Sequence, residues 1–266
     1  MPSSELPPIS NKALYACRVF TKWFSFFFFG FTSLLLSILI LPPMRLLLHP
    51  KERFKKYARR FISASFRFFI GLMHVIGTAT MKTTDRHLFR NLSSKVIVAN
   101  HPSLLDVVML ISLIPNADCI VNAYLSHSIV TVIIHQLYIV SSMNYQEIMD
   151  ACFESLKQGN CLIIFPEGTR TPRSGKIIPK KGAARIALES GCGIVPVHIG
   201  GNDKYGLGKK DPWTAHNHKE RYIYLISMGE EISPDKYSSL PKPAAAKALT
   251  NEFSSFLFPG ENYSSN

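Results

Sequence analysis

The chain has 266 residues, enough for one full-sized core or for one domain with an appendage. Its 30 Lys and Arg against 18 Asp and Glu give a formal net charge of +12, which suits an anionic partner: nucleic acid, an acidic lipid surface, an acidic carrier protein or a phosphorylated substrate. The odd number of cysteines and the lack of any CxxC spacing argue against a disulfide scaffold and a zinc site, and favour a reducing compartment; they are Cys17, Cys119, Cys152, Cys161 and Cys192.

Near the N-terminus, residues 23–41 (WFSFFFFGFTSLLLSILIL) carry no charge. As a helix they would extend about 28 Å, close to the roughly 30 Å hydrocarbon core of a bilayer. Pro42 and Pro43 are expected to end this helix, and residues 1–22 are expected to form an N-terminal tail. The segment therefore predicts a membrane anchor; the alternative is a buried helix of a soluble protein.

A basic linker and a second apolar segment follow this helix. Residues 61–77 (FISASFRFFIGLMHVIG) hold Arg67 at their centre, which favours a position in the membrane interface, because an arginine at mid-bilayer costs about 2.5–3.5 kcal/mol. Because basic residues next to membrane spans favour the cytoplasmic side, the linker should face the cytoplasm. This orientation fits either a single membrane span or a hairpin that enters one leaflet. The rest of the chain would then face the cytoplasm and anionic headgroups. The basic residues of the linker are Arg45, Lys51, Arg53, Lys55, Lys56, Arg59 and Arg60.

From residue 95 onward, apolar β-rich runs alternate with helical patterns. This alternation predicts an α/β fold with a largely parallel sheet flanked by helices. We expect a catalytic domain over residues 78–258, an anchoring region over 23–77 and a loose tail over 259–266. The expected strands are 96–99, 118–125, 137–141, 161–165, 194–199 and 222–228, and the expected helices are 103–113, 126–135, 144–158, 181–190 and 241–258.

The stretch NHPSLLD (100–106) places an imidazole and a carboxylate across a strand-to-helix junction. Pro102 fits the first helical turn, which leaves His101 in the loop and Asp106 one turn into the helix. His101 could then fold back and donate one ring N–H to Asp106, leaving its other nitrogen as a general base. The alternative is a capping histidine with a solvated aspartate.

A second stretch, FPEGTR (165–170), follows another predicted strand and should lie at the same sheet edge. Gly168 permits close approach of the backbone, Thr169 offers a hydroxyl, and Arg170 offers a planar fork suited to a phosphate. More basic residues follow: Arg173, Lys176, Lys180 and Lys181. A solvated basic loop is the alternative interpretation.

Together NHPSLLD, FPEGTR and IVPVHI (194–199) resemble three blocks of the glycerolipid acyltransferases, the 1-acyl-glycerol-3-phosphate acyltransferase family. The resemblance covers residues 95–200, and the apolar N-terminus is similar to that of bacterial members. It implies a glycerol-3-phosphate acyltransferase-like fold, a bacterial inner-membrane location and transfer of an acyl chain from acyl-carrier protein or acyl-CoA to a lysophospholipid. The acceptor implied first is 1-acyl-glycerol-3-phosphate, giving phosphatidic acid, with no other cofactor.

The same resemblance implies a role for each matching residue. His101 would be the base and Asp106 its orienting partner, while Pro196 would shape the acceptor pocket. Glu167, Gly168, Thr169 and Arg170 would hold the acceptor, often through its phosphate. No GxSxG elbow suggests a covalent enzyme intermediate, so the transfer would be direct.

One position departs from the family pattern. Ser142, in QLYIVSS (136–142), stands where a second block usually has an arginine that contacts the acceptor phosphate. Either the lysines after Arg170 (Lys176, Lys180 and Lys181) substitute for it, or the acceptor is another lyso-lipid, such as lyso-ornithine lipid. A non-catalytic membrane-surface protein that binds anionic lipid is a further alternative.

Two other interpretations are weaker. Nucleic-acid binding would suit the charge, but the basic runs lack aromatic platforms and the apolar N-terminus has no role in it, so we expect no nucleic-acid partner. His216 and His218 form an HxH that could bind a metal, but in a polar stretch this pattern is more typical of a surface loop. We therefore expect no metal site.

Overall fold

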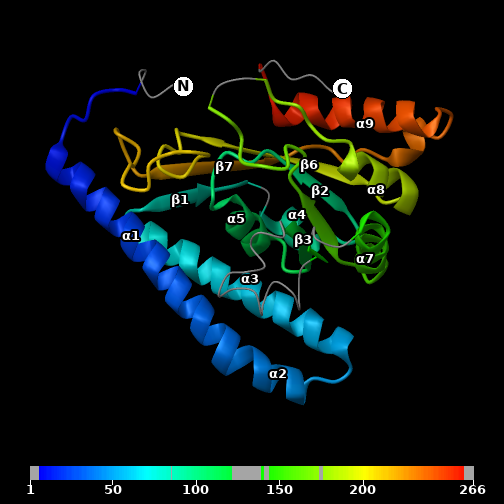
Figure 1. The fold of residues 1–266 in the computed structure, drawn as a ribbon, viewed down its shortest axis with the longest axis horizontal. Helices are drawn as coiled ribbons and strands as arrows, with labels where there is room; N and C mark the ends of the chain where they lie inside the picture. The colour runs from blue at the N-terminus through cyan, green and yellow to red at the C-terminus, as the bar shows by residue number, and fades with distance from the viewer. Residues whose placement is uncertain (1–5, 85, 122–138, 141–143, 174–175, 261–266) are drawn as a thin grey trace.

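The computed structural model describes residues 6–84, 86–121, 139–140, 144–173 and 176–260 (Figure 1). Within them, a seven-stranded sheet runs in the order β1-β7-β6-β2-β5-β3-β4. Neighbouring strands are parallel except for β6 and β7, which are antiparallel. The predicted α/β fold with a largely parallel sheet is therefore confirmed. The strands are β1 (Ala79–Lys82), β2 (Val96–Ala99), β3 (Ala117–Val121), β4 (Ile139–Val140), β5 (Cys161–Ile164), β6 (Ile194–Gly201) and β7 (Tyr222–Met228).

Helices cover both faces of the sheet, which explains why its central strands are almost continuously apolar. On β2, Ile97 and Ala99 pack in one buried cluster with α3 and α5, while Val96 and Val98 pack in a second cluster with α7, α8 and α9. Figure 1 shows α9 on one side of the sheet and α3 and α5 on the other. These helices are α3 (Lys51–Val75), α5 (Asp106–Leu113), α7 (Tyr145–Lys157), α8 (Gly182–Ser190) and α9 (Lys242–Leu257).

The capping residues fix two helix ends where the sequence predicts them. The Asn144 side chain accepts a hydrogen bond from the backbone N–H of Glu147 at 2.9 Å, and the Glu147 carboxylate accepts one from Asn144 N–H at 3.2 Å. This reciprocal capping box starts α7. Gly191, with φ +69°, ends α8 in the left-handed conformation that glycine adopts most readily.

Two short elements were not predicted, and parts of others lie outside the described residues. β1 pairs with β7 at the sheet edge, and α4 (Arg86–Asn91) follows it. The expected helix 126–135 lies wholly outside the described residues, as does Ser142. The expected strands 118–125 and 137–141 are described only in part, as β3 and β4.

The N-terminal helix is longer than the sequence predicts at both ends. It runs through α1 (Lys12–Leu35), a π-helical turn (Leu36–Ile40) and α2 (Leu41–Leu47). It begins inside the expected tail, where the Asn11 side chain accepts a hydrogen bond from Leu14 N–H at 2.9 Å. The prediction that Pro42 and Pro43 end the helix is wrong: both lie in the first turn of α2, directly after the π turn, where a missing N–H is tolerated.

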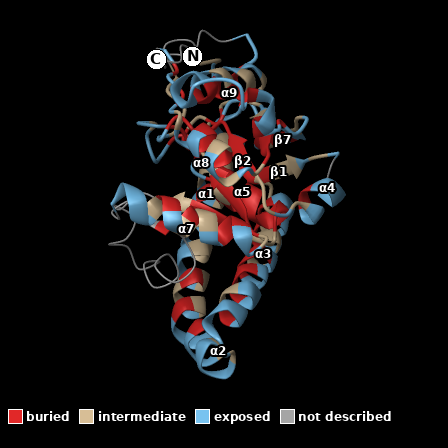
Figure 2. Ribbon diagram, turned by 90° about the vertical axis from the view of Figure 1, so that its right-hand side faces the viewer, coloured by how far each residue is buried: buried red, intermediate tan, exposed pale blue. Residues whose placement is uncertain are grey.

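Of the helices in the described part of the chain, one, Lys12–Leu47, is long and apolar enough to cross a membrane. Figure 2 shows that much of its surface is exposed where it extends beyond the body. The sequence feature that predicts a membrane anchor is therefore a continuous helix in the structure. Its exposed apolar side chains are Leu14, Phe20, Trp23, Phe24, Phe27, Phe31, Leu35, Ile38, Leu39, Ile40, Leu46 and Leu47.

Helix α3 joins the expected basic linker and the apolar segment 61–77 into one element that packs on the body. Its Phe69, Ile70 and Met73 are buried in the same cluster as α5. Arg59, expected in the basic linker, is instead buried in a salt bridge with Asp118 of β3, at 2.5 and 2.7 Å. The packed core therefore extends N-terminal of residue 78. The membrane-interface position of 61–77 and the division into domains stay predictions.

Candidate active site

His101 and Asp106 meet at the carboxyl end of β2. The imidazole Nδ1 lies 2.8 Å from Oδ2 of Asp106, to which it donates a hydrogen bond. Asp106 is wholly buried, and the His101 side chain is 17% exposed. One detail of the prediction is wrong: α5 begins at Asp106 itself, not at 103, so the carboxylate lies at the helix N-terminus, where the helix dipole favours negative charge.

Two residues that sequence reasoning missed complete the surroundings of this carboxylate. Ser103 donates to Asp106 twice, from its backbone N–H to Oδ2 at 2.7 Å and from its hydroxyl to Oδ1 at 2.6 Å. The same hydroxyl lies 2.8 Å from the hydroxyl of Tyr224 on β7. The S-x-x-D spacing of a capping box could have indicated Ser103. Tyr224 lies 121 residues further along the chain, and no pattern in the sequence around it indicates a contact with Ser103.

The FPEGTR turn packs directly against His101, as the sequence predicts. Phe165 stacks on the imidazole, with ring centroids 4.1 Å apart and planes inclined by 23°. With Nδ1 bonded to Asp106 and one ring face covered, the orientation of the imidazole is fixed. Within the described residues, Nε2 of His101 has no hydrogen-bond partner, so this nitrogen is the one placed to accept a proton.

Glu167 links the two motif loops. Its Oε1 accepts hydrogen bonds from His101 N–H at 2.9 Å and from the Thr171 hydroxyl at 2.8 Å, and Thr171 N–H donates to the His101 carbonyl at 2.7 Å. Burial raises the pKa of the Glu167 carboxyl above its usual value, and the bonds from Thr171 and His101 oppose that shift. The contacts observed for Glu167 are to these loops; contact with an acceptor stays a prediction.

Arg170 is also engaged with the protein. Its Nη1 donates to the carbonyls of Leu207 at 3.0 Å and Gly208 at 2.9 Å. These carbonyls belong to the segment 202–221, which joins β6 to β7 and which we call the β6–β7 loop. Arg170 therefore ties the FPEGTR turn to the β6–β7 loop in this structure, and its phosphate-binding role stays a prediction.

The remaining predicted residues of the turn present cationic and polar groups to solvent. Gly168 has φ +67°, a backbone conformation that favours glycine, and Nζ of Lys180 lies 2.7 Å from the position that a Cβ would occupy there. Thr169 and Lys180 are exposed, and Lys181 is half-buried just before α8. The structure thus brings the predicted lysine Lys180 to the turn.

Pro196 lies apart from this group. It is buried within β6, in register with Val98 of β2, and its carbonyl accepts a hydrogen bond from Gly229 N–H at 2.8 Å. Its position is inside the sheet rather than among the loops at the sheet edge. Its predicted effect on an acceptor pocket would have to act through strand packing.

The β6–β7 loop is held against the motif loops by buried or partly buried charges. Arg173 forms a bidentate ion pair with Asp211, at 2.8 and 2.9 Å, and a second ion pair with Asp203 at 2.9 Å. Lys204 is 5% exposed; it donates to the Ile223 carbonyl at 2.8 Å and lies 4.6 Å from the ring centre of Tyr224. Burial lowers the pKa of Lys204 to about 8. These contacts therefore hold the β6–β7 loop in place beside the candidate active site.

A cavity of about 410 Å³ opens beside the two motif loops. Its wall includes Pro102, next to His101, and Thr171, next to Arg170. Arg173 and Lys204 also line it, together with Asp203, which pairs with Arg173. A concave space with polar groups beside a candidate base is where a small polar substrate group would be expected.

The two histidines of the HxH pattern have separate surroundings. His216 is wholly buried and packs on the Tyr222 ring at 4.1 Å between centroids, so its interpretation as a surface residue is wrong. His218 Nδ1 lies 2.7 Å from the carbonyl of Pro7. Both pack near the start of α1, where Tyr15 accepts a hydrogen bond from His216 N–H at 3.2 Å. The described residues contain no group of His, Cys, Asp and Glu side chains that could hold a metal ion.

All five cysteines are free thiols. Burial raises the pKa of Cys119 and Cys152 to about 12 and that of Cys161 to about 11. These three thiols are therefore protonated at neutral pH and are packing residues rather than nucleophiles.

Comparison with known proteins finds acyltransferases. Residues 80–200 match the family model described as Acyltransferase. A chloroplastic 1-acyl-sn-glycerol-3-phosphate acyltransferase from Brassica napus is 30% identical over 57% of this chain and 46% of its own length. A 1-acyl-sn-glycerol-3-phosphate acyltransferase from Helicobacter pylori is 30% identical over 55% of this chain and 65% of its own length. This chain thus spans about half to two thirds of these relatives.

A solved structure shares the fold over nearly the whole chain. The 1-acyl-sn-glycerophosphate (LPA) acyltransferase PlsC from Thermotoga maritima superposes with a TM-score of 0.61 at 21% identity, covering 91% of this chain and 97% of that one. The family match over residues 80–200 and the curated relatives show that the α/β body of this chain is similar to the glycerolipid acyltransferases, and the solved structure shows the same fold.

Proposed function

We propose that this chain is a membrane-anchored O-acyltransferase that moves an acyl chain from acyl-carrier protein or acyl-CoA to the free hydroxyl of a lysophospholipid. The observation that carries the proposal is the 2.8 Å contact between Nδ1 of His101 and Oδ2 of the buried Asp106. This contact fixes the tautomer that leaves Nε2 unprotonated and able to act as a base.

In the proposed step, Nε2 of His101 takes the proton of the lipid hydroxyl while its oxygen attacks the carbonyl carbon of the thioester. A new ester C–O bond forms and the C–S bond breaks. The leaving thiolate then takes the proton back from the imidazolium, so the histidine is regenerated and no covalent enzyme intermediate is needed. General-base catalysis of this kind contributes about 10²–10⁴-fold, and positioning supplies much of the remainder.

The proposed acceptor is 1-acyl-glycerol-3-phosphate, and the product is phosphatidic acid. The printed names of the relatives support this choice. The cationic groups near His101 support it too, because Arg170, Arg173 and Lys180 suit a phosphate. The transfer needs no cofactor beyond the thioester. Another lyso-lipid, such as lyso-ornithine lipid, is the competing acceptor.

The proposed location is the bacterial inner membrane, with the α/β body facing the cytoplasm. The long apolar helix Lys12–Leu47 supports anchoring. The basic residues Arg53 and Lys56 on exposed positions of α3 support contact with an anionic surface, at about 1 kcal/mol each. Both donors, acyl-carrier protein and acyl-CoA, are cytoplasmic partners in this arrangement.

The test is a panel of acceptors and donors offered to the purified full chain in detergent micelles. Labelled acyl-carrier protein thioester and acyl-CoA are each combined with 1-acyl-glycerol-3-phosphate, lyso-ornithine lipid and neutral monoacylglycerol. We expect the greatest kcat/KM with 1-acyl-glycerol-3-phosphate. Greater turnover of lyso-ornithine lipid would replace the acceptor but keep the reaction, and no transfer to any acceptor would reject the enzymatic proposal in favour of a non-catalytic lipid-binding protein.

A further inference from the structure

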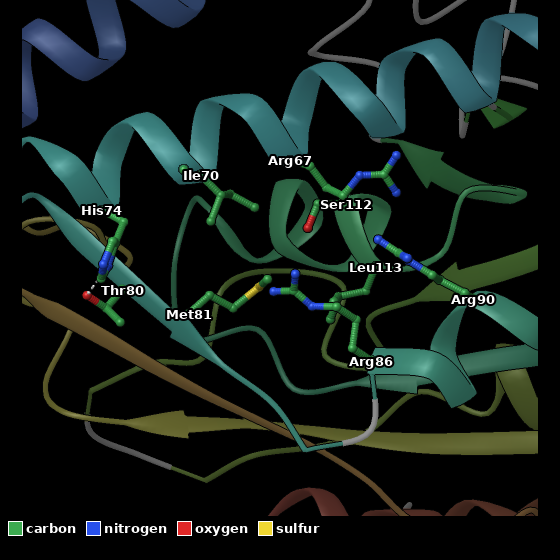
Figure 3. A pocket seen from close by; sticks show the side chains of 10 residues that line it. Arg67, Ile70, His74, Thr80, Met81, Arg86, Arg90, Ser112 and Leu113 are labelled. Carbon is green, nitrogen blue, oxygen red and sulfur yellow. Dashed lines mark hydrogen bonds between the residues drawn. The ribbon is translucent and has the colours of Figure 1, made fainter.

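A second cavity, of about 290 Å³, lies where α3, β1, α4 and the last turn of α5 meet (Figure 3). From α5, the residues that line this cavity are Ser112 and Leu113, at the end of the helix. Asp106 of the candidate active site lies at the other end of α5, seven positions before Leu113, which is about 10 Å along the helix axis. None of its lining residues belongs to the motif loops or to the cavity beside them. It is therefore a separate site.

Three guanidinium groups enter this cavity. Arg67 comes from α3, and Arg86 and Arg90 lie four residues apart on one face of α4. In Figure 3 the Arg90 side chain points inward, the Arg86 side chain extends toward Met81 and the Arg67 guanidinium lies along α3, with the Ser112 hydroxyl between α3 and α4. Like charges at this helical spacing repel one another, and the third guanidinium adds to the repulsion. Arg86 and Arg90 are exposed and Arg67 is half-buried, so all three can reach a ligand from solution, and an anion bound between them would relieve the repulsion.

Two other arginines of this chain have acidic partners: Arg59 pairs with Asp118, and Arg173 with Asp203 and Asp211. In the part of the chain that the structure describes, no Asp or Glu forms an ion pair with the three guanidiniums of the cavity. The charged groups that act on Arg67 are Arg90 and Arg86, and both are positive. Among the described residues, the positive charge of the cavity is therefore not matched by a carboxylate.

The rest of the wall is apolar and leaves room. Ile70, Met81 and Leu113 supply hydrocarbon surface. Gly71 faces open space: no atom lies within 4 Å of the position that its Cβ would occupy. A space of this size with one cationic end and one apolar wall suits a phosphate that carries a small organic group, and is too small to enclose a whole lipid.

The cavity lies on the helix that borders the proposed membrane anchor. Phe68, next to Arg67 on α3, is 66% exposed, and Val75, two turns further along the helix, is 82% exposed. Figure 1 shows α1 and α2 running alongside α3. Exposed apolar side chains next to a cationic cavity are what a lipid headgroup would meet at a membrane surface.

We propose that Arg67, Arg86 and Arg90 form a binding site for the phosphate of an anionic lipid headgroup, distinct from the candidate active site. Inorganic phosphate offers the same chemistry without the lipid, and the experiment separates the two. Planar guanidinium forks bind phosphate oxygens through paired charge-assisted hydrogen bonds, which explains the use of arginine at all three positions.

The test is calorimetric titration of the full chain in non-ionic detergent with three probes: inorganic phosphate, dihexanoyl phosphatidylglycerol and dihexanoyl phosphatidylcholine. Two variants address the site in different ways. Arg67→Gln/Arg90→Gln removes charge, and Gly71→Leu fills the cavity at unchanged charge. Arg60→Gln, an exposed arginine on the same helix, is the matched control, and His101→Ala shows whether binding is independent of acyl transfer.

We expect saturable binding of phosphatidylglycerol, weaker by about tenfold or more in both site variants and unchanged in Arg60→Gln and His101→Ala. Binding of inorganic phosphate alone, with the same variant pattern, would assign the site to free phosphate. Equal binding of phosphatidylcholine, equal losses in Arg60→Gln, or full binding by Gly71→Leu would each overturn the proposal. Melting temperatures of the variants near that of the parent show that losses of binding do not arise from unfolding.

Discussion

The aromatic ring of Phe165 stacks on the imidazole of His101, with centroids 4.1 Å apart. Phe165 opens the FPEGTR turn and His101 lies in the NHPSLLD stretch, so this contact joins two motifs that are separated by more than sixty residues in the sequence. Together with the hydrogen bond to Asp106, it determines which way Nε2 points. The imidazole of His101 is thus oriented by Asp106, which bonds to Nδ1, and by Phe165, which covers one face of the ring.

Replacing Phe165 by Leu should weaken catalysis more than acceptor binding. Aromatic pairs contribute about 0.5–1.5 kcal/mol beyond the area they bury, which corresponds to roughly a 2- to 10-fold fall in kcat. The acceptor KM should change little, because the stacking orients the base rather than the lipid. Steady-state kinetics of the variant check this, and a raised KM with unchanged kcat would show that Phe165 instead contacts the acceptor.

Arg170→Gln tests whether the turn also holds phosphate. Loss of a charged hydrogen bond costs about 1.5–3 kcal/mol, so the KM for 1-acyl-glycerol-3-phosphate should rise about 10- to 150-fold. The KM for monoacylglycerol, which has no phosphate, should change far less. If both acceptors are affected equally, the only role of Arg170 is the one seen in the structure, bonding to the carbonyls of Leu207 and Gly208.

Burial of His216 should make the protein sensitive to acid. Burial lowers the pKa of its folded-state imidazole to about 4 from 6.5, so between these pH values the unfolded state binds the proton and the folded state does not. The free energy of unfolding therefore falls as the pH falls through this window, by about 2 kcal/mol between about pH 7 and about pH 5 for this group. It is regained as the pH rises.

His216→Phe should remove that part of the pH dependence, because phenylalanine can pack on Tyr222 without titrating. The measurement is urea-induced unfolding in detergent at the two pH values, for the parent and the variant. The difference in unfolding free energy between the two proteins should shift in favour of the variant at the lower pH. A difference that stays the same at both pH values would show that His216 is protonated equally in both states.

The buried ion pair between Arg59 and Asp118 should hold α3 on the sheet. Arg59→Met leaves Asp118 buried without its cation, which should cost about 3–5 kcal/mol of unfolding free energy. The double variant Arg59→Met/Asp118→Leu should be more stable than this single variant. Arg60→Met, one position away and exposed, should change stability by less than about 0.5 kcal/mol. Equal stability of the Arg59 and Arg60 variants would contradict the importance of the pair.

The fold could be predicted because its central strands are buried on both faces. Runs such as VIVA (96–99) and CLII (161–164) have no polar position, which is typical of strands in a covered parallel sheet. The edge strand β1, with the sequence ATMK, is equally short but contains polar residues, so it does not give that signal. The end of the N-terminal helix was misplaced because a π turn before Pro42 accommodates the prolines, and this turn has no simple sequence pattern.

The site was predictable where its residues are close in sequence, or where, like the FPEGTR turn, they follow another strand of the predicted parallel sheet. His101 and Asp106 are five positions apart with Pro102 between them, so local geometry sufficed. Tyr224 reaches Ser103 only because β7 turns back antiparallel to β6, which no local pattern specifies. His216 was misjudged for the same reason: its burial depends on packing near the start of α1, about 200 residues earlier in the chain.

The most direct test of the central claim is acyl transfer by the His101→Ala variant. The purified full chain and the variant, matched by melting temperature, receive labelled acyl-carrier protein thioester or acyl-CoA with 1-acyl-glycerol-3-phosphate, and phosphatidic acid is measured. If His101 is the general base that Asp106 orients, kcat in the variant falls by about 10²–10⁴-fold. Phosphatidic acid formed at the same rate by both proteins would contradict that role.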